Sequence, residues 1–275
     1  MGLFFNYDKP GKGVDKDAPK KKGIFLYFEL MWRKLGKLFT SNMLYFLVSL
    51  PVILIYHFFS YLLLSNVIPP ETDPTIYSQL TLIFTALITI LFGTGPVSCG
   101  YTFLLRNFAK EEHVWLTSDF FQKIKENFKQ GIVIFLADIL VLFLGTNSIM
   151  FYSSIYKSGH QIGLYMTAIV FLFMMMYTFM HFYLYQFAIT FDNKITAVFK
   201  NSFIMALASL PMNIFLTMLV LVLTYMLFSV LTPVAIVLVM LLFWISFMRF
   251  PIDFYSARII QRKLIDSITT GESDE

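Results

Sequence analysis

The stretch that decides the fold is residues 201–248, which reads NSFIMALASLPMNIFLTMLVLVLTYMLFSVLTPVAIVLVMLLFWISFM. It contains no charged residue. As one straight helix its 48 residues would extend roughly 70 Å, more than twice the thickness of a bilayer core. The stretch must therefore fold back on itself. Thr232 and Pro233 are the expected turn, because proline ends one helix and starts the next one well.

The rest of the chain has the same apolar character. Of its 275 residues, 57% are hydrophobic and only 14% are charged, against roughly 45–50% and about 25% in a soluble domain. Lipid must cover the surplus apolar surface, so the sequence predicts an integral membrane protein. The fold class is an all-α polytopic membrane helix bundle in one transmembrane domain, residues 41–255. Its six expected spans are residues 43–64, 77–100, 131–155, 163–189, 211–231 and 233–252.

The basic residues predict the orientation of these spans. Positive charge stays on the cytoplasmic side of short loops, and a six-span chain with both termini cytoplasmic places every lysine and arginine except Lys157 on that side. The predicted cytoplasmic tails are residues 1–22, which are basic, and residues 256–275. Because the basic residues lie beside apolar runs, the net charge of +4 does not indicate a nucleic-acid partner.

Residues 23–40 predict an amphipathic helix before the first span. Apolar side chains recur at positions 24, 25, 28, 31, 32, 35, 38 and 39, whereas Glu29, Arg33, Lys34 and Lys37 occupy the other face. We expect this helix to lie on the cytoplasmic surface of the membrane. Its basic face fits either a simple topology anchor or a site for anionic lipid.

Two more cytoplasmic helices are expected, near residues 118–129 and 193–204. In the first, Ser118 or Thr117 would cap the helix and Asp119 would lie in its first turn. In the second, Asp192 and Asn193 would form the cap. The apolar side chains expected to be buried are Phe120, Phe121, Ile124 and Phe128 in the first helix, and Ile195, Val198 and Phe199 in the second.

Motifs for catalysis are missing from the sequence. It has no Walker-type phosphate loop, no H-E-x-x-H and no G-x-S-x-G, and its four histidines are too dispersed to predict a zinc site. A single cysteine, Cys99, excludes an internal disulfide. We therefore expect a protein that is not an enzyme and that needs no cofactor or metal.

Polar groups inside the spans are the remaining candidates for chemistry. Asp138 is the one clear intramembrane acid, and His181 in the fourth span is its candidate partner. The pair would bind an ion, take part in a proton path, or only join two helices. Gly93, Gly95 and Pro96 predict a weakened or kinked helix in the second span. Arg249 and Asp253, four residues apart, predict a local ion pair.

Several segments resemble the YesL-like family of bacterial multi-pass membrane proteins. They are residues 9–14 and 28–39, residues 42–45 and 49–51, and, most specifically, Gly95-Pro96, Gly100, Arg106-Asn107, residues 119–121 and residues 127–131. Members of this family carry a domain of unknown function and are often encoded beside carbohydrate ABC importers. The resemblance implies an accessory subunit in the bacterial cytoplasmic membrane, in contact with lipid and with a permease or ATPase subunit of such an importer.

The loop of residues 106–130 is the expected docking segment. It carries five basic residues, and its candidate docking residues are Arg106, Asp119, Phe121, Lys125 and Asn127. The same segment would also fit a helix that lies on lipid headgroups. A different function stays open as well: a secondary transporter or channel that uses Asp138 and His181 together with the helix break at Gly93 to Pro96.

Overall fold

The structure is a computed structural model that describes residues 23–191 and 194–265. The expected tail of residues 1–22, the expected cap at Asp192 and Asn193, and residues 266–275 lie outside the described residues. In chain order the helices are α1 (Ile24–Arg33), α2 (Leu35–Ser65), α3 (Pro74–Phe92), α4 (Pro96–Lys110), α5 (Leu116–Glu126), α6 (Phe128–Lys157), α7 (Ile162–Thr190), α8 (Ile195–Ala208), α9 (Leu210–Phe228), α10 (Pro233–Val239) and α11 (Ile245–Ile260), with π-helical segments η1 (Met240–Trp244) and η2 (Gln261–Ile265).

Six helices of the described chain are long and apolar enough to cross a membrane. They are α2, α3, α6, α7, α9 and the continuous helix Pro233–Lys263, which comprises α10, η1 and α11. All regular structure in the described residues is helical. The protein is therefore an all-helical, multi-pass membrane protein, as the apolar runs predict. The expected turn is confirmed, since α9 ends at Phe228 and Pro233 is the first residue of α10.

The helix ends differ from the expected boundaries at several places. The expected span of residues 77–100 is divided, because α3 ends at Phe92 and α4 begins at Pro96. The amphipathic helix ends at Arg33 rather than at residue 40, because Lys34 leaves the helical conformation with φ −103° and ψ 8°, and Leu35 already begins α2. Similarly, α5 ends at Glu126, and Phe128 belongs to α6. The last span also continues beyond residue 252, to Ile260 and into η2.

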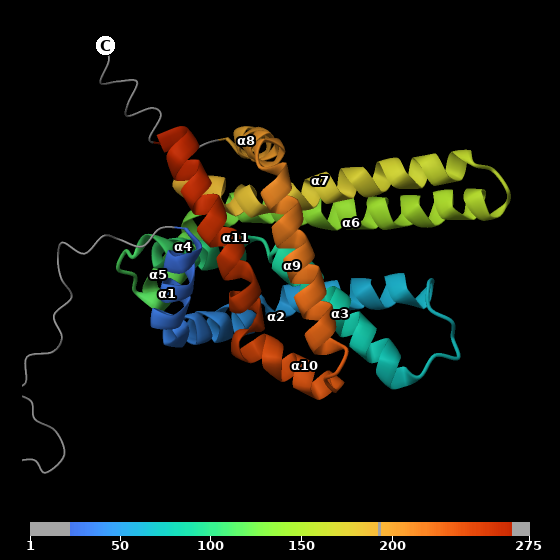
Figure 1. The fold of residues 1–275 in the computed structure, drawn as a ribbon, viewed down its shortest axis with the longest axis horizontal. Coiled ribbons are helices and arrows are strands. Elements are labelled where there is room, and N and C mark those ends of the chain that lie inside the picture. Colours follow the sequence, from blue (N-terminus) through green and yellow to red (C-terminus); the bar gives the residue numbers. More distant parts are fainter. Residues whose placement is uncertain (1–22, 192–193, 266–275) are drawn as a thin grey trace, which may run out of the picture.

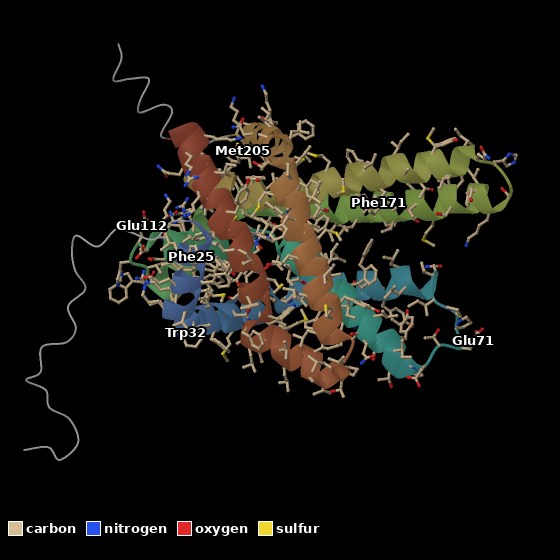
Figure 2. The ribbon with its side chains drawn as sticks, in the orientation of Figure 1. Phe25, Trp32, Glu71, Glu112, Phe171 and Met205 are labelled. Atoms are coloured by element: carbon tan, nitrogen blue, oxygen red, sulfur yellow. The ribbon has the colours of Figure 1, made fainter. Side chains whose placement is uncertain are left out.

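The helix α1 packs on the bundle with one face and is exposed on the other. The Tyr27 ring stacks on the Phe250 ring of α11 at a centroid distance of 5.6 Å, and Leu30 is fully buried. Phe25 and Trp32, labelled in Figure 2, are exposed. An apolar face without protein cover fits a helix that lies in the membrane interface.

The helices α5 and α8, which the sequence predicts on the cytoplasmic side, bury fewer side chains than expected. In α5 only Phe120 is buried, whereas Phe121 is 47% and Phe128 51% exposed. The expected cap is also wrong: Trp115 precedes the helix, and its N–H donates to the Asp119 carboxylate at 2.8 Å. In α8, Val198 is fully buried and Ile195 and Phe199 are half-buried. The exposed phenylalanines are free to contact lipid or a partner.

The helix α4 lies at the centre of the arrangement. It contacts α2, α5, α6, α7 and α11, and most of its side chains are buried. Around it, α6 and α7 form a long antiparallel hairpin that extends away from α1, α4 and α5 (Figure 1). Figure 2 shows Glu112, after α4, and Glu71, between α2 and α3, at opposite ends of the molecule. Residues 91–96 are all buried, so the break between α3 and α4 lies inside the bundle.

Candidate functional site

Asp138 lies in the middle of α6 with its side chain completely buried. Its Oδ1 atom accepts a hydrogen bond of 2.8 Å from the Tyr177 hydroxyl of α7. The same oxygen lies 2.7 Å from His181 Nε2, although the ring does not point its N–H straight at that oxygen. The structure thus brings the two candidate intramembrane residues into contact. An acid at this depth is costly without such partners.

His181 is enclosed by aromatic rings. Ring centroids lie 4.9 Å away for Phe92, 5.1 Å for Tyr177 and 6.0 Å for Tyr185, and the imidazole is fully buried. Tyr177, His181 and Tyr185 are spaced by four residues and therefore line one face of α7.

The helix break is positioned by this same face of α7. Gly93 and Gly95 have φ of +80° and +65°, values that residues other than glycine rarely adopt. The Gly95 N–H donates to the Tyr185 hydroxyl at 3.1 Å. A Cβ atom on Gly93 would lie 2.5 Å from Ser98 Oγ and 2.8 Å from Cε2 of the Tyr185 ring, so both side chains limit the space there.

Side chains also bond two further backbone groups at the break, the Thr94 N–H and the Ile90 carbonyl. The Thr94 N–H donates to Ser98 Oγ at 2.7 Å, and the Thr94 hydroxyl donates to the Tyr45 hydroxyl at 3.0 Å. On the α3 side, Arg249 Nη1 donates to the Ile90 carbonyl at 2.8 Å. A broken helix persists inside a membrane only when its freed polar groups find such partners.

Arg249 also forms the expected ion pair, because its Nε lies 3.2 Å from Asp253 Oδ2. Both side chains are nearly completely buried, and Gln186 Nε2 donates to the other carboxylate oxygen of Asp253 at 3.0 Å. Sequence reasoning missed Gln186 and Ile90 as partners. Only the four-residue spacing of Arg249 and Asp253 was a usable signal, since the other contacts join segments far apart in the chain.

Four buried polar atoms near this site have no hydrogen-bond partner among the described residues. They are Asp138 Oδ2, His181 Nδ1, His181 Nε2 and the Tyr56 hydroxyl of α2. Tyr56 and Tyr185 both lie close enough to Asp138 for an electrostatic interaction with its side chain. The site therefore retains unused capacity to bind a proton or another small polar species.

The candidate docking residues do not form one surface. Arg106 of α4 is half-buried and its Nη1 donates to Thr190 Oγ1 at 2.6 Å, which ties α4 to α7. Asp119 bonds the backbone at the start of α5, and Asn127 donates to the Lys123 carbonyl at its end. Phe121 and Lys125 remain, exposed and one helical turn apart on α5. Only these two are placed together for contact with a partner.

The polar side of α5 is held by local charges. Lys123 lies 2.6 Å from Glu126, and Gln122 donates to the same carboxylate at 2.7 Å. Hydrogen bonds from Lys123 and Gln122 lower the pKa of Glu126 from its usual value. In the described part of the chain no group of three or more histidine, cysteine, aspartate or glutamate side chains lies close enough to hold a metal ion.

Comparison with known proteins gives one match. Residues 76–149 match the model of a family described as "Protein of unknown function, DUF624". Neither the curated proteins nor the solved structures compared with the chain gave a match. The matched residues include the break between α3 and α4, all of α5 and Asp138, whereas His181 lies beyond them. This part of the chain is thus similar to a family whose description records no function.

Proposed function

We propose that the protein is a non-catalytic accessory or regulatory subunit of a carbohydrate ABC importer in the bacterial cytoplasmic membrane, with both termini cytoplasmic. The resemblance to the YesL-like family suggests the partner, and the basic loops support the orientation. The observation that carries the proposal is the exposed pair Phe121 and Lys125 on α5. Aromatic rings such as that of Phe121 are enriched in protein interfaces, and a charge such as that of Lys125 fits their polar rim.

The packing of α5 against α4 connects this exposed surface to the interior of the bundle. Gly100 of α4 lies so close to α5 that an added Cβ would meet the Phe120 carbonyl oxygen at 2.5 Å. Phe120 itself is fully buried, so α5 is held tightly against α4. A partner bound to Phe121 and Lys125 would therefore act on the helix that begins at the central break.

Photocrosslinking tests the docking surface. A photoreactive residue replaces Phe121 in native membranes, and a matched position is Phe171, which is exposed on the α6–α7 hairpin (Figure 2). We expect permease or ATPase adducts from position 121 and lipid adducts from position 171. The charge reversal Lys125→Glu should lower the yield from position 121. Lipid adducts alone at both positions would remove the accessory role.

A second candidate function is a secondary transporter or channel. The contact between Asp138 and His181 beside a broken helix favours it, because such sites coordinate substrates and coupling ions in transporters. Uptake into proteoliposomes that contain only this protein is the test. We expect Asp138→Asn to abolish uptake if the pair couples transport. Uptake that survives this substitution would exclude the pair from transport.

A further inference from the structure

We propose that Asp138 and His181 form a proton-binding site whose protonation state controls the break between α3 and α4. The proposal concerns regulation within the bundle and holds whichever partner the protein has. It stands on the contact between the two side chains, on their burial, and on the face of α7 that joins them to the break.

The chemistry of the pair selects a proton as the ligand. A carboxylate and an imidazolium in contact are neutral overall, so in this protonation state the buried pair places no net charge in the bundle. One further proton from water converts the carboxylate to a carboxylic acid and leaves the imidazolium without a counter-charge. Release of one proton to water leaves the carboxylate unbalanced. Either change places a net charge inside the bundle, which is unfavourable at this depth.

The surroundings offer no other group to balance that charge near neutral pH. The titratable side chains facing the pair are Tyr56 from α2 and Tyr177 and Tyr185 from α7, which are phenols, while α3 presents only the Phe92 ring. Cys99 of α4 lies close to Tyr185. Arg249 and Asp253 of α11 are already paired with each other. Asp138 Oδ2 and both ring nitrogens of His181 have no hydrogen-bond partner among the described residues, so a proton can be gained or lost there.

Three contacts transmit the charge state to the break. Phe92, which packs against His181, is the last residue of α3. Tyr185, which also faces His181, accepts the hydrogen bond of Gly95 at the start of α4. The same Tyr185 ring limits the space at Gly93. A shift of the imidazole therefore acts on both ends of the interrupted helix.

The chain carries its own reporter of this movement. Cys99 is its single cysteine, lies three residues after Pro96 and is completely buried. In full-length protein reconstituted in phosphatidylethanolamine–phosphatidylglycerol nanodiscs, the rate of Cys99 labelling by N-ethylmaleimide measures opening of the break. Because thiol reactivity itself rises with pH, the wild-type rate is divided at each pH by the rate of the His181→Gln variant.

We expect this ratio to change by about 5-fold or more between about pH 5 and pH 8. A 5-fold change is at the lower end of the coupling usually found between two sites. For Asp138→Asn, the labelling rate divided by that of His181→Gln should not change with pH. Tyr185→Phe removes the hydroxyl that bonds Gly95 but leaves the charged pair, the ring at Gly93 and the Phe92 contact in place, so its ratio should change with pH less than the wild-type ratio does. Tyr165→Phe, an exposed change on α7, should behave as wild type.

A wild-type ratio that is constant with pH would overturn the proposal, as would a full response retained in Asp138→Asn. If His181→Gln does not fold, His181→Asn replaces it as the divisor, because this variant also lacks the imidazole and keeps the thiol. These measurements are independent of crosslinking at Phe121, so a failed docking surface and a failed proton site give different results.

Discussion

The side-chain oxygen of Asn42 in α2 accepts a hydrogen bond from the backbone N–H of Ser246 at 2.7 Å, across more than 200 residues of sequence. The amide nitrogen of the same side chain donates to the Met240 and Leu241 carbonyls at 2.8 and 2.7 Å. These groups flank or belong to η1, where a π-helical turn alters the regular ladder of backbone hydrogen bonds. One buried amide therefore supplies hydrogen-bond partners to backbone groups in the irregular part of the last span.

Replacement of this amide should destabilise the bundle. Asn42→Ala leaves two carbonyls and one N–H without their side-chain partner in a buried position, and we expect a loss of about 1–3 kcal/mol in the free energy of unfolding. Asn147→Ala is the matched control, because Asn147 is exposed on α6 and bonds only the Phe143 carbonyl of its own helix. Unfolding in mixed micelles gives both values. Equal stability of the two variants would contradict the role of Asn42.

Gly131 should tolerate no side chain. An added Cβ would lie 2.5 Å from Pro96 Cα and 2.6 Å from Pro96 N, which are backbone atoms at the start of α4 and cannot easily move. We expect Gly131→Ala to cost about 1–3 kcal/mol of stability through overpacking. Gly36→Ala, on α2 with nothing within 4 Å, should instead be neutral or stabilising by about 0.5–1 kcal/mol. Thermal unfolding of the two variants distinguishes these outcomes.

The buried pair of Arg249 and Asp253 predicts a strongly non-additive double substitution. Arg249→Met alone leaves the Asp253 carboxylate buried without its cation and should cost about 3–5 kcal/mol. The double variant Arg249→Met with Asp253→Leu removes both charges, so we expect it to be more stable than the single variant. A double variant that loses the sum of the two single effects would show that the charges act independently.

The sequence predicts the helices better than the site. Residues 201–248 require two spans because no charged residue interrupts them, and Asp138 stands out because its span has no other acid. The contact with His181 follows from an antiparallel α6–α7 hairpin, in which both residues lie at similar depth. The spacing of Tyr177, His181 and Tyr185 was a usable signal of one functional face, since it repeats every four residues.

Other contacts depend on backbone groups that no pattern reveals. Arg249 bonds Ile90, and Tyr185 bonds Gly95, only because the interrupted helix leaves a carbonyl and an N–H to be satisfied. Asn42 belongs to the family resemblance, yet its role follows from a π-helical segment almost 200 residues later. Fewer of the candidate docking residues are available to a partner than expected, because Arg106, Asp119 and Asn127 bond groups within the protein itself.

The N-terminal cap of α3, which lies outside the spans, should depend on pH. The Asp73 carboxylate accepts a hydrogen bond of 2.7 Å from the Thr75 N–H, and the backbone N–H groups of Thr75 and Ile76 lower the pKa of Asp73. A group whose pKa is lowered on folding contributes stability above its unfolded pKa of about 4 and loses it as the pH falls through the lower folded value. Acidification should therefore fray the first turn of α3.

Hydrogen exchange of the amides at Thr75 to Tyr77, corrected for intrinsic exchange rates, measures this fraying. Wild-type protection should fall below about pH 4, where the carboxylate gains its proton. Asp73→Asn keeps a capping oxygen but does not titrate, so its protection should be independent of pH, whereas Asp73→Ala should be unprotected throughout because it has no capping oxygen. Ser78→Ala, later in the same helix, serves as control. If wild type and Asp73→Asn lose protection together on acidification, the carboxylate is not the group that responds, and the cap is set by Pro74 and the loop before it.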